Sequence, residues 1–255
     1  MSRKTDWDVR IKRLHRANKI FFWVVLAMGT ANVTYIAVWG SKRWDEVAFR
    51  TMQYVGMLII MKLPHILKLR FRIEMPWLLS AFMVLFGFSS LVLGDGLDFY
   101  GKYPWWDSVL HAQSGTLLSL MAFWIIHVIM AENEKYIFLN KHFLALFIVL
   151  FSLGLGACWE ILEYLYDSLA GTNSQQFMAS TTGSILSSYD IPLCGHEALR
   201  DTMTDLMLDL AGALLVAIYS YMNHNKWMTD VERYKKLLDN GADNDKTVGT
   251  EATGQ

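Results

Sequence analysis

The apolar residues of this chain fall in long blocks, and that spacing constrains its fold more than any other feature. Six blocks cover about residues 20–39, 47–67, 76–94, 107–131, 142–165 and 201–222. Each comes close to the roughly 20 mostly apolar residues that a helix needs to cross a bilayer. Of the 255 residues 53% are hydrophobic, and the formal net charge is only −1. We therefore predict an all-α, polytopic transmembrane helix bundle of about six spans, forming one integral membrane domain over residues 1–226.

The two ends of the chain have different compositions. The basic segment 1–19 precedes the first apolar block, as it would in a secretory signal. That block is too long for a signal core and five further blocks follow, so we predict an uncleaved first span. At the other end, residues 227–255 read as a cytoplasmic segment, with a short amphipathic helix at 227–240 followed by a disordered polar tail.

Lysine and arginine residues gather on one side of the predicted spans. They lie in the N-terminal segment, in the link at 68–72 and in the flank at 226–236. Because such residues are enriched in cytoplasmic loops, we predict that both termini lie inside and that the loop 166–200 lies outside. Three basic residues in the first outer link run against this trend.

Ionisable residues stand inside the last three blocks at helical spacing. Residues three or four positions apart share one face of a helix. Three such stripes are Asp107 with His111, Glu160 with Glu163, and Asp201 with Asp205 and Asp209. Three consecutive spans bring the start of the fourth, the end of the fifth and the start of the sixth to one membrane face. We predict that these side chains converge there, with Asp209 one turn deeper.

The cost of burying charge makes this convergence informative. A lone aspartate at the bilayer centre costs about 2.5–3.5 kcal/mol on insertion scales, so several carboxylates must face one another, water or a cation. Helix capping would explain Asp107 or Asp201 alone, and a core histidine would explain His111 alone. Their joint occurrence favours a functional cluster.

The residue types indicate a metal site. Oxygen ligands with a single imidazole suit Mg²⁺, Mn²⁺ or Ca²⁺, and Zn²⁺ is less favoured because thiolates and further histidines are missing. We take as metal-ligand candidates Asp107, His111, Glu160, Glu163, Asp201 and Asp205. As catalytic candidates we take Glu160, Glu163 and Asp209.

Three motifs in this order resemble the YjdF-like family of small bacterial inner-membrane proteins. They are W-D-x-x-x-H-x-x-x-G at 106–115, W-E-x-x-E-Y at 159–164 and D-T-x-x-D at 201–205. A looser pattern, D-x-x-x-H, E-x-x-E and D-x-x-x-D-x-x-G, resembles VanZ-like membrane proteins, which are associated with low-level glycopeptide resistance. The resemblance covers about the last three spans. It implies a multi-pass protein of the bacterial inner membrane, in a family without an established activity.

Three functions remain open. The first is a divalent-metal-dependent enzyme that acts on a lipid or cell-envelope precursor at the membrane face. The second is cation or proton transport through the same residues, and the third is a non-catalytic scaffold or resistance protein. The sequence shows no P-loop, haem-ligand pair, nucleophile elbow or nucleic-acid-binding patch, so we expect no nucleic-acid partner. It does not indicate an oligomeric state.

The loop 166–200 is long for a link between adjacent spans and mixes small polar with apolar residues. We predict that it covers the pocket as a lid. Asp190, His196 and Glu197 could reach the site from above, although solvated loop positions are the more ordinary explanation of each. Cys158 and Cys194 allow one disulfide or two unpaired thiols, and unpaired thiols are the more ordinary case.

Overall fold

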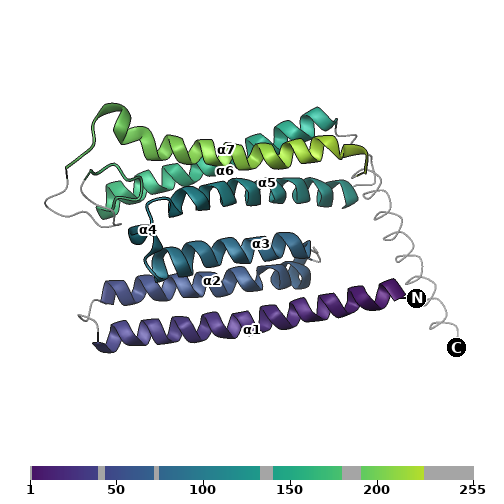
Figure 1. Ribbon diagram of the computed structural model, residues 1–255, viewed down its shortest axis with the longest axis horizontal. Coiled ribbons are helices and arrows are strands. Elements are labelled where there is room, and N and C mark those ends of the chain that lie inside the picture. The colour runs from purple at the N-terminus through teal and green to yellow at the C-terminus, as the bar shows by residue number, and fades with distance from the viewer. Residues whose placement is uncertain (1, 40–43, 72–74, 133–139, 180–190, 227–255) are drawn as a thin grey trace. The chain divides into compact units, whose positions relative to one another are not determined.

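The computed structural model describes residues 2–39, 44–71, 75–132, 140–179 and 191–226, and most of these are helical. The helices are α1 (Ser2–Trp39), α2 (Trp44–Phe71), α3 (Trp77–Gly87), α4 (Phe99–Lys102), α5 (Trp106–Glu132), α6 (Lys141–Ala170) and α7 (Arg200–Met222) (Figure 1). A π-helix, η1 (Phe88–Gly96), continues α3, and a 3-10 turn, η2 (Gly195–Leu199), leads into α7. The all-α prediction is confirmed within this part of the chain. The segment predicted for 227–255 lies outside the described residues.

Four helical stretches among the described residues are long and apolar enough to cross a membrane. They are Trp77–Gly94, Trp106–Met130, Lys141–Leu169 and Gly195–Met222, which match the third to sixth predicted spans. In α1 the apolar stretch is shorter, Lys19–Tyr35. Helix α2 covers the second predicted span but carries Lys62 and an internal Pro64. The total of about six spans and the cytoplasmic placement of the termini stay predictions.

Helix α6 is longer than the predicted span 142–165 at its C-terminal end. It begins after Asn140, whose side chain accepts a hydrogen bond from the His142 backbone N–H at 3.0 Å. It ends where Gly171 turns to φ 65° and donates its N–H to the Asp167 carbonyl. Glycine adopts this left-handed conformation without steric cost, which makes it the usual residue just after a helix end.

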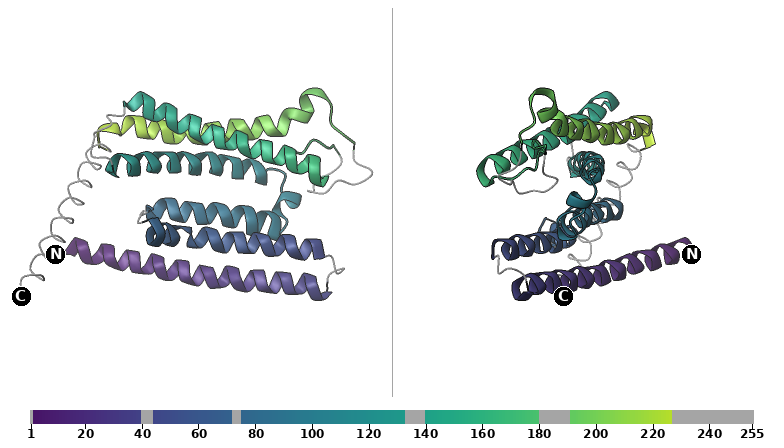
Figure 2. Two further views of the ribbon diagram at one scale, coloured as in Figure 1. Left: turned by 180° about the vertical axis from the view of Figure 1, so that it is seen from behind. Right: turned by 60° about the vertical axis from the view of Figure 1, so that its left-hand side comes forward.

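The chain divides into two compact units, Met1–Leu110 and His111–Gln255. In the first unit α1, α2 and α3 with η1 lie side by side (Figure 2). Their shared core consists of Val25, Tyr54, Met57, Met61 and Val92. Near the end of this unit the Trp106 indole N–H donates to the Ser89 carbonyl of η1 at 3.3 Å. That bond, and ring contacts of Phe99 with Tyr103 and Trp106, hold the first residue of α5.

The second unit is a bundle of α5, α6 and α7 (Figures 1 and 2). Its apolar core lies toward the α6 start and the α7 end and consists of Ala122, Ile126, Met130, Leu144, Ile148, Val216 and Ala217. Farther along α6, the buried Ser152 hydroxyl donates to the Gly115 carbonyl of α5 at 2.9 Å. The helices therefore have an apolar contact layer at one end and a polar contact layer toward the other. The single domain predicted for 1–226 stays a prediction.

Two glycines allow the backbones of α5 and α7 to come close. A Cβ at Gly212 would lie 2.7 Å from the Thr116 nitrogen and 2.8 Å from the Ala112 carbonyl oxygen. A Cβ at Gly115 would lie 2.6 Å from the Asp209 Cα and closer still to the Asp209 carbonyl oxygen. Both contacts are to backbone, which cannot move aside as a flexible side chain can. Small residues at this crossing are therefore required for the observed helix spacing.

We predict that Gly115→Ala lowers the free energy of unfolding by about 1–3 kcal/mol, because the added methyl group forces α5 and α7 apart. Gly154→Ala is the matched control on α6, since a Cβ there meets nothing within 4 Å. Thermal unfolding of both variants in one detergent measures the difference. Equal melting temperatures for the two would contradict the close crossing.

Candidate functional site

Three predicted carboxylates gather around the imidazole ring of a fourth predicted residue, His111. Together the four residues come from all three helices of the second unit. His111 Nδ1 lies 3.5 Å from Asp209 Oδ2, and Nε2 lies 3.8 Å from Asp205 Oδ2 and 3.9 Å from Glu160 Oε1. All four side chains are buried, and Asp205 and Asp209 are only 1% exposed. We call these residues, His111, Glu160, Asp205 and Asp209, the His111 cluster. The structure thus brings together the start of α5, the second half of α6 and the first half of α7.

Asp209 is held against the ring by its neighbours. The Ser114 hydroxyl donates to Asp209 Oδ1, and it also lies 2.8 Å from the His111 carbonyl oxygen. The absence of a side chain at Gly156 leaves room for Asp209, since a Cβ there would lie 3.1 Å from the Asp209 Cγ. A carboxylate at Nδ1 favours the tautomer with a proton on that nitrogen. Nε2, on the other side of the ring, faces Asp205 and Glu160.

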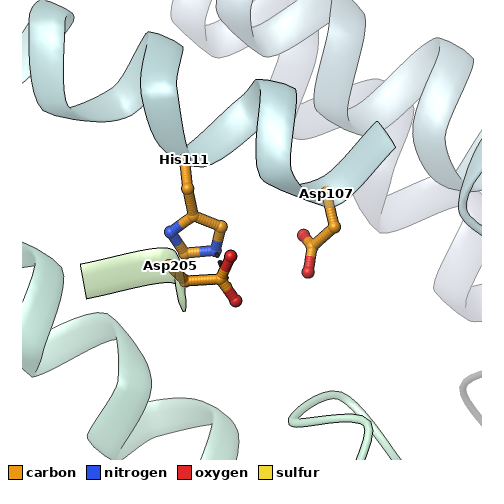
Figure 3. Close-up of side chains that lie close together, drawn as sticks. All are labelled: Asp107, His111 and Asp205. Carbon is orange, nitrogen blue, oxygen red and sulfur yellow. Dashed lines mark ion pairs between the residues drawn. The ribbon is translucent and has the colours of Figure 1, made fainter. Parts of the chain in front are cut away.

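Asp107 adds a further carboxylate beside the ring. It lies one turn before His111 on α5, and its side chain and that of His111 project from the same side of the helix (Figure 3). One ligand atom from each of Asp107, His111 and Asp205 lies within 4.8 Å of the other two. Two carboxylate oxygens and one imidazole nitrogen at this spacing could hold a metal ion.

The two remaining predicted residues lie one turn toward the helix ends. Glu163, three residues beyond Glu160, accepts a hydrogen bond from the Trp159 indole on its own helix at 3.0 Å. Asp201 stands in the first turn of α7, four residues before Asp205. Both side chains are only partly buried. They flank the His111 cluster on the side of the 171–194 connection.

Sequence reasoning missed Asp167, which anchors that connection. Its buried carboxylate accepts hydrogen bonds from the Thr172 hydroxyl at 2.6 Å, the Ser174 N–H at 2.7 Å and the Gln175 N–H at 3.0 Å. The available signal was an aspartate one turn before a helix-ending glycine and a run of small polar residues. Charge-assisted bonds of this kind are among the stronger ones in proteins. The first residues after α6 are therefore fixed to it.

Gln175, also missed, joins two helices beside the cluster. Its side-chain amide donates to the Thr202 hydroxyl at 3.0 Å and lies 3.4 Å from the Glu160 carbonyl oxygen. Beyond it, Phe177 to Ala179 pair with Ile191 to Leu193 through two backbone hydrogen bonds of 2.8 Å. The described part of the loop is thus bonded to both α6 and α7 beside the cluster.

The other loop predictions have mixed outcomes. Phe177, Met178 and Leu193 are partly buried, whereas Ile191 is exposed. His196 is exposed, and Glu197 pairs with Arg200 at the surface at 3.6 Å. Asp190, like the rest of 180–190, lies outside the described residues. Movement of the loop as a lid stays a prediction. Cys158 and Cys194 are both free and exposed.

Comparison with known proteins identifies one family. Its sequence profile, described as "Predicted membrane protein (DUF2238)", matches residues 46–226, which is more than half of the chain and includes every residue of the His111 cluster. Searches of the curated proteins and of the solved structures find no match.

We predict that Asp167→Asn loosens the connection after α6, because an amide nitrogen would face N–H donors where a carboxylate oxygen now accepts. Hydrogen bonds to a charged acceptor contribute about 1.5–3 kcal/mol to stability, so we expect the variant to lose about that much free energy where the connection is bonded to Asp167. Hydrogen exchange at the Ser174 and Gln175 amides should rise, and limited proteolysis within 171–179 should quicken.

Glu197→Gln is the control for this change, because its pair with Arg200 is exposed and such pairs contribute about 0–1 kcal/mol. If both variants leave exchange at these two amides unchanged, Asp167 is not the anchor.

Proposed function

The chain belongs to the DUF2238 family of predicted membrane proteins, and we propose that it is a divalent-metal-dependent enzyme acting on a lipid-borne substrate at one membrane face. The observation that carries this proposal is the His111 cluster. An imidazole and three carboxylates are buried together within an apolar bundle, with Asp107 one turn away. Intramembrane ionisable residues of this kind are costly and usually functional.

Charge balance supports a cation at this place. Ionised Glu160, Asp205 and Asp209 carry three negative charges, and His111 offsets one of them only when it is protonated. Buried charges in low dielectric need compensation, by protons or by a positive ion. A divalent ion supplies two positive charges at the point where the carboxylates meet.

The distances fit a shared ion. Two atoms that both bind Mg²⁺ at about 2.1 Å lie at most about 4.2 Å apart, and for Ca²⁺ at 2.3–2.6 Å the limit is about 4.6–5.2 Å. The separations of His111 Nε2 from Asp205 and Glu160, 3.8 and 3.9 Å, fall within both limits. The ligand atoms of Asp107, His111 and Asp205 lie within 4.8 Å of one another, which falls within the calcium range. For Mg²⁺ or Mn²⁺ these atoms would have to move slightly closer together. Zn²⁺ is less favoured because only one imidazole is present.

These contacts suggest a different role for each residue. His111 Nε2, Asp205 and Asp107 are the proposed ligands, and Glu160 is the proposed fourth ligand or general base. Asp209 orients the imidazole through Nδ1, an arrangement that recurs behind metal-binding histidines. Glu163 and Asp201 lie farther out, where they would meet the polar end of a substrate.

The chemistry we propose is hydrolysis of a phosphoryl or acyl ester. The bound ion would polarise the substrate oxygen. Glu160 accepts a proton from a water molecule, whose oxygen bonds to the phosphorus or carbonyl carbon, and the departing alcohol takes that proton. A lipid or cell-envelope precursor fits this proposal, in which the cluster lies near a membrane face. Arg200, the nearest basic residue in sequence, pairs with Glu197, so an anionic substrate would depend on the ion for binding.

We also propose the finer membrane placement. Helices α1 and α2 supply the first two of six spans, both termini are cytoplasmic, and the protein is a YjdF-like component of the bacterial inner membrane. The apolar stretch Lys19–Tyr35 supports a span in α1, and the order of the three motifs supports the family resemblance. The more distant VanZ-like resemblance would place the substrate in the cell envelope.

Cation or proton transport is the second candidate, favoured by Ser119. This α5 side chain is completely buried, and its hydroxyl has no hydrogen-bond partner in the described part of the chain, so it could extend a polar route from the cluster. The route would then meet Ala122, Ile126 and Met130, which belong to the apolar core. Ion flux in proteoliposomes that is abolished by Asp205→Asn would favour transport. Metal binding without flux would favour the enzyme.

We predict that the purified wild-type protein retains about one divalent ion per chain and that Asp205→Asn does not. Asp209→Asn should weaken binding by about 10–100-fold, as loss of an orienting carboxylate does. The control variant Glu197→Gln, which removes an exposed carboxylate near the start of α7, should bind the ion like wild type. Elemental analysis after dialysis against Mg²⁺, Mn²⁺ or Ca²⁺, followed by calorimetry, measures this.

A folding control separates metal loss from misfolding. Without metal, Asp205→Asn should unfold at or above the wild-type temperature, because it removes one of several crowded buried charges. The enzyme proposal fails if the wild type binds no stoichiometric divalent ion, or if folded Asp205→Asn binds it equally well. Absence of both metal binding and flux would leave the scaffold function.

A further inference from the structure

Basic and aromatic side chains meet where α6 begins and α7 ends. The Lys141 ammonium lies over the Tyr221 ring, 4.7 Å from its centroid. The His142 ring meets the same tyrosine edge-on, with centroids 5.2 Å apart. His224 and Lys226 follow directly after α7. We call Lys141, His142, Tyr221, His224 and Lys226 the Tyr221 patch.

This patch lies at the opposite end of the second unit from the His111 cluster. Lys141 and Glu160 are 19 positions apart on α6, which corresponds to about 28 Å of helix. The hydrocarbon core of a bilayer is about 30 Å thick. If the cluster lies near one membrane face, the patch lies at the other. Tyrosine is typical of that interface.

The patch is positively charged. No acidic residue occurs in 140–150 or 215–226. Burial and the nearby Lys141 ammonium lower the pKa of His224 from its usual 6.5, which favours the neutral imidazole. The charge therefore comes from Lys141 and Lys226, which are both exposed.

The surroundings of the patch are apolar and exposed. Phe143 and Leu146 on α6 and Ile218 and Met222 on α7 are each more than half exposed. In a membrane such side chains face lipid chains. A ligand that combines an anionic phosphate with acyl chains matches both parts of this surface, whereas free phosphate matches only the lysines.

We propose that the Tyr221 patch binds the phosphate headgroup of an anionic membrane phospholipid. The lysines contact the phosphate, Tyr221 holds the Lys141 ammonium, and the acyl chains lie along α6 and α7. Clusters of basic residues at membrane-facing helix ends recognise anionic lipids in this way. The inference is independent of the metal centre.

The test compares phosphatidylglycerol with phosphatidylcholine, titrated into the full-length protein in detergent and followed by native mass spectrometry. Wild type should bind phosphatidylglycerol more tightly. Each lysine near a membrane surface raises the affinity for an anionic lipid roughly fivefold. The double variant Lys141→Gln with Lys226→Gln should therefore bind phosphatidylglycerol roughly 25-fold more weakly. Lys102→Gln with Arg200→Gln removes the same charge outside the patch and should leave binding unchanged.

Three outcomes would overturn the proposal. The first is that wild type shows no preference for phosphatidylglycerol, and the second is that both double variants lose the same affinity for it. The third is that inorganic phosphate competes with phosphatidylglycerol equally tightly, which would indicate a phosphate site without lipid specificity. Melting temperatures in phosphatidylcholine confirm that the variants are folded. If the patch double variant does not fold, the single variant Lys226→Gln carries the test, because Lys226 lies beyond the last turn of α7. Its affinity for phosphatidylglycerol should fall roughly fivefold.

Discussion

The approach of α5, α6 and α7 around Asp209 is the constraint on which the second unit depends. Asp209 places its backbone against Gly115 and its carboxylate against Gly156, while Gly212 meets the backbone of α5. A larger side chain at Gly115 or Gly212 would separate α5 from α7, and one at Gly156 would displace the Asp209 carboxylate. The carboxylates of α6 and α7 would then move away from His111, and lipid or water would enter. Close packing and the buried polar cluster are therefore one feature, since helix association within a bilayer relies on such contacts.

Much of the cluster could be predicted from sequence because two simple rules apply to it. Helical spacing placed Asp205 and Asp209 on one face, and the order of three spans brought that face to His111 and Glu160. The same rules failed to separate Glu163 from Glu160. Three residues along a helix leave side chains about 60° apart, so one can point inward while the other bonds elsewhere, here to Trp159. Asp167 and Gln175 were not predicted because their partners depend on the path of a loop.

Hydropathy predicted the third to sixth spans because their apolar windows are long, whereas the first two spans stay predictions. Helix α2 carries Lys62 and Pro64 within its apolar run, which lowers its apolar character without breaking the helix. The π-helix at Phe88–Gly96 has no comparable sequence signal. In this segment the Ser89 carbonyl accepts the Trp106 indole N–H, and Gly94 lies against the Tyr100 ring. At its C-terminal end α6 continues to Ala170, where Gly171 turns the chain and donates its N–H to the Asp167 carbonyl.

The anchored loop bears on how the cluster works. A buried carboxylate attracts a cation strongly only while water is kept away, because the attraction grows as the local dielectric falls. Asp167 fixes the first residues of the loop to α6, and Gln175 ties them to α7 beside Glu160. Any motion that opens the cluster at this point must break the Gln175 bonds. Entry elsewhere, between helices and from the lipid side, leaves them intact. If the substrate is lipid-borne, as we propose, the lateral route breaks none of these bonds, and the loop can keep α6 and α7 joined beside the cluster.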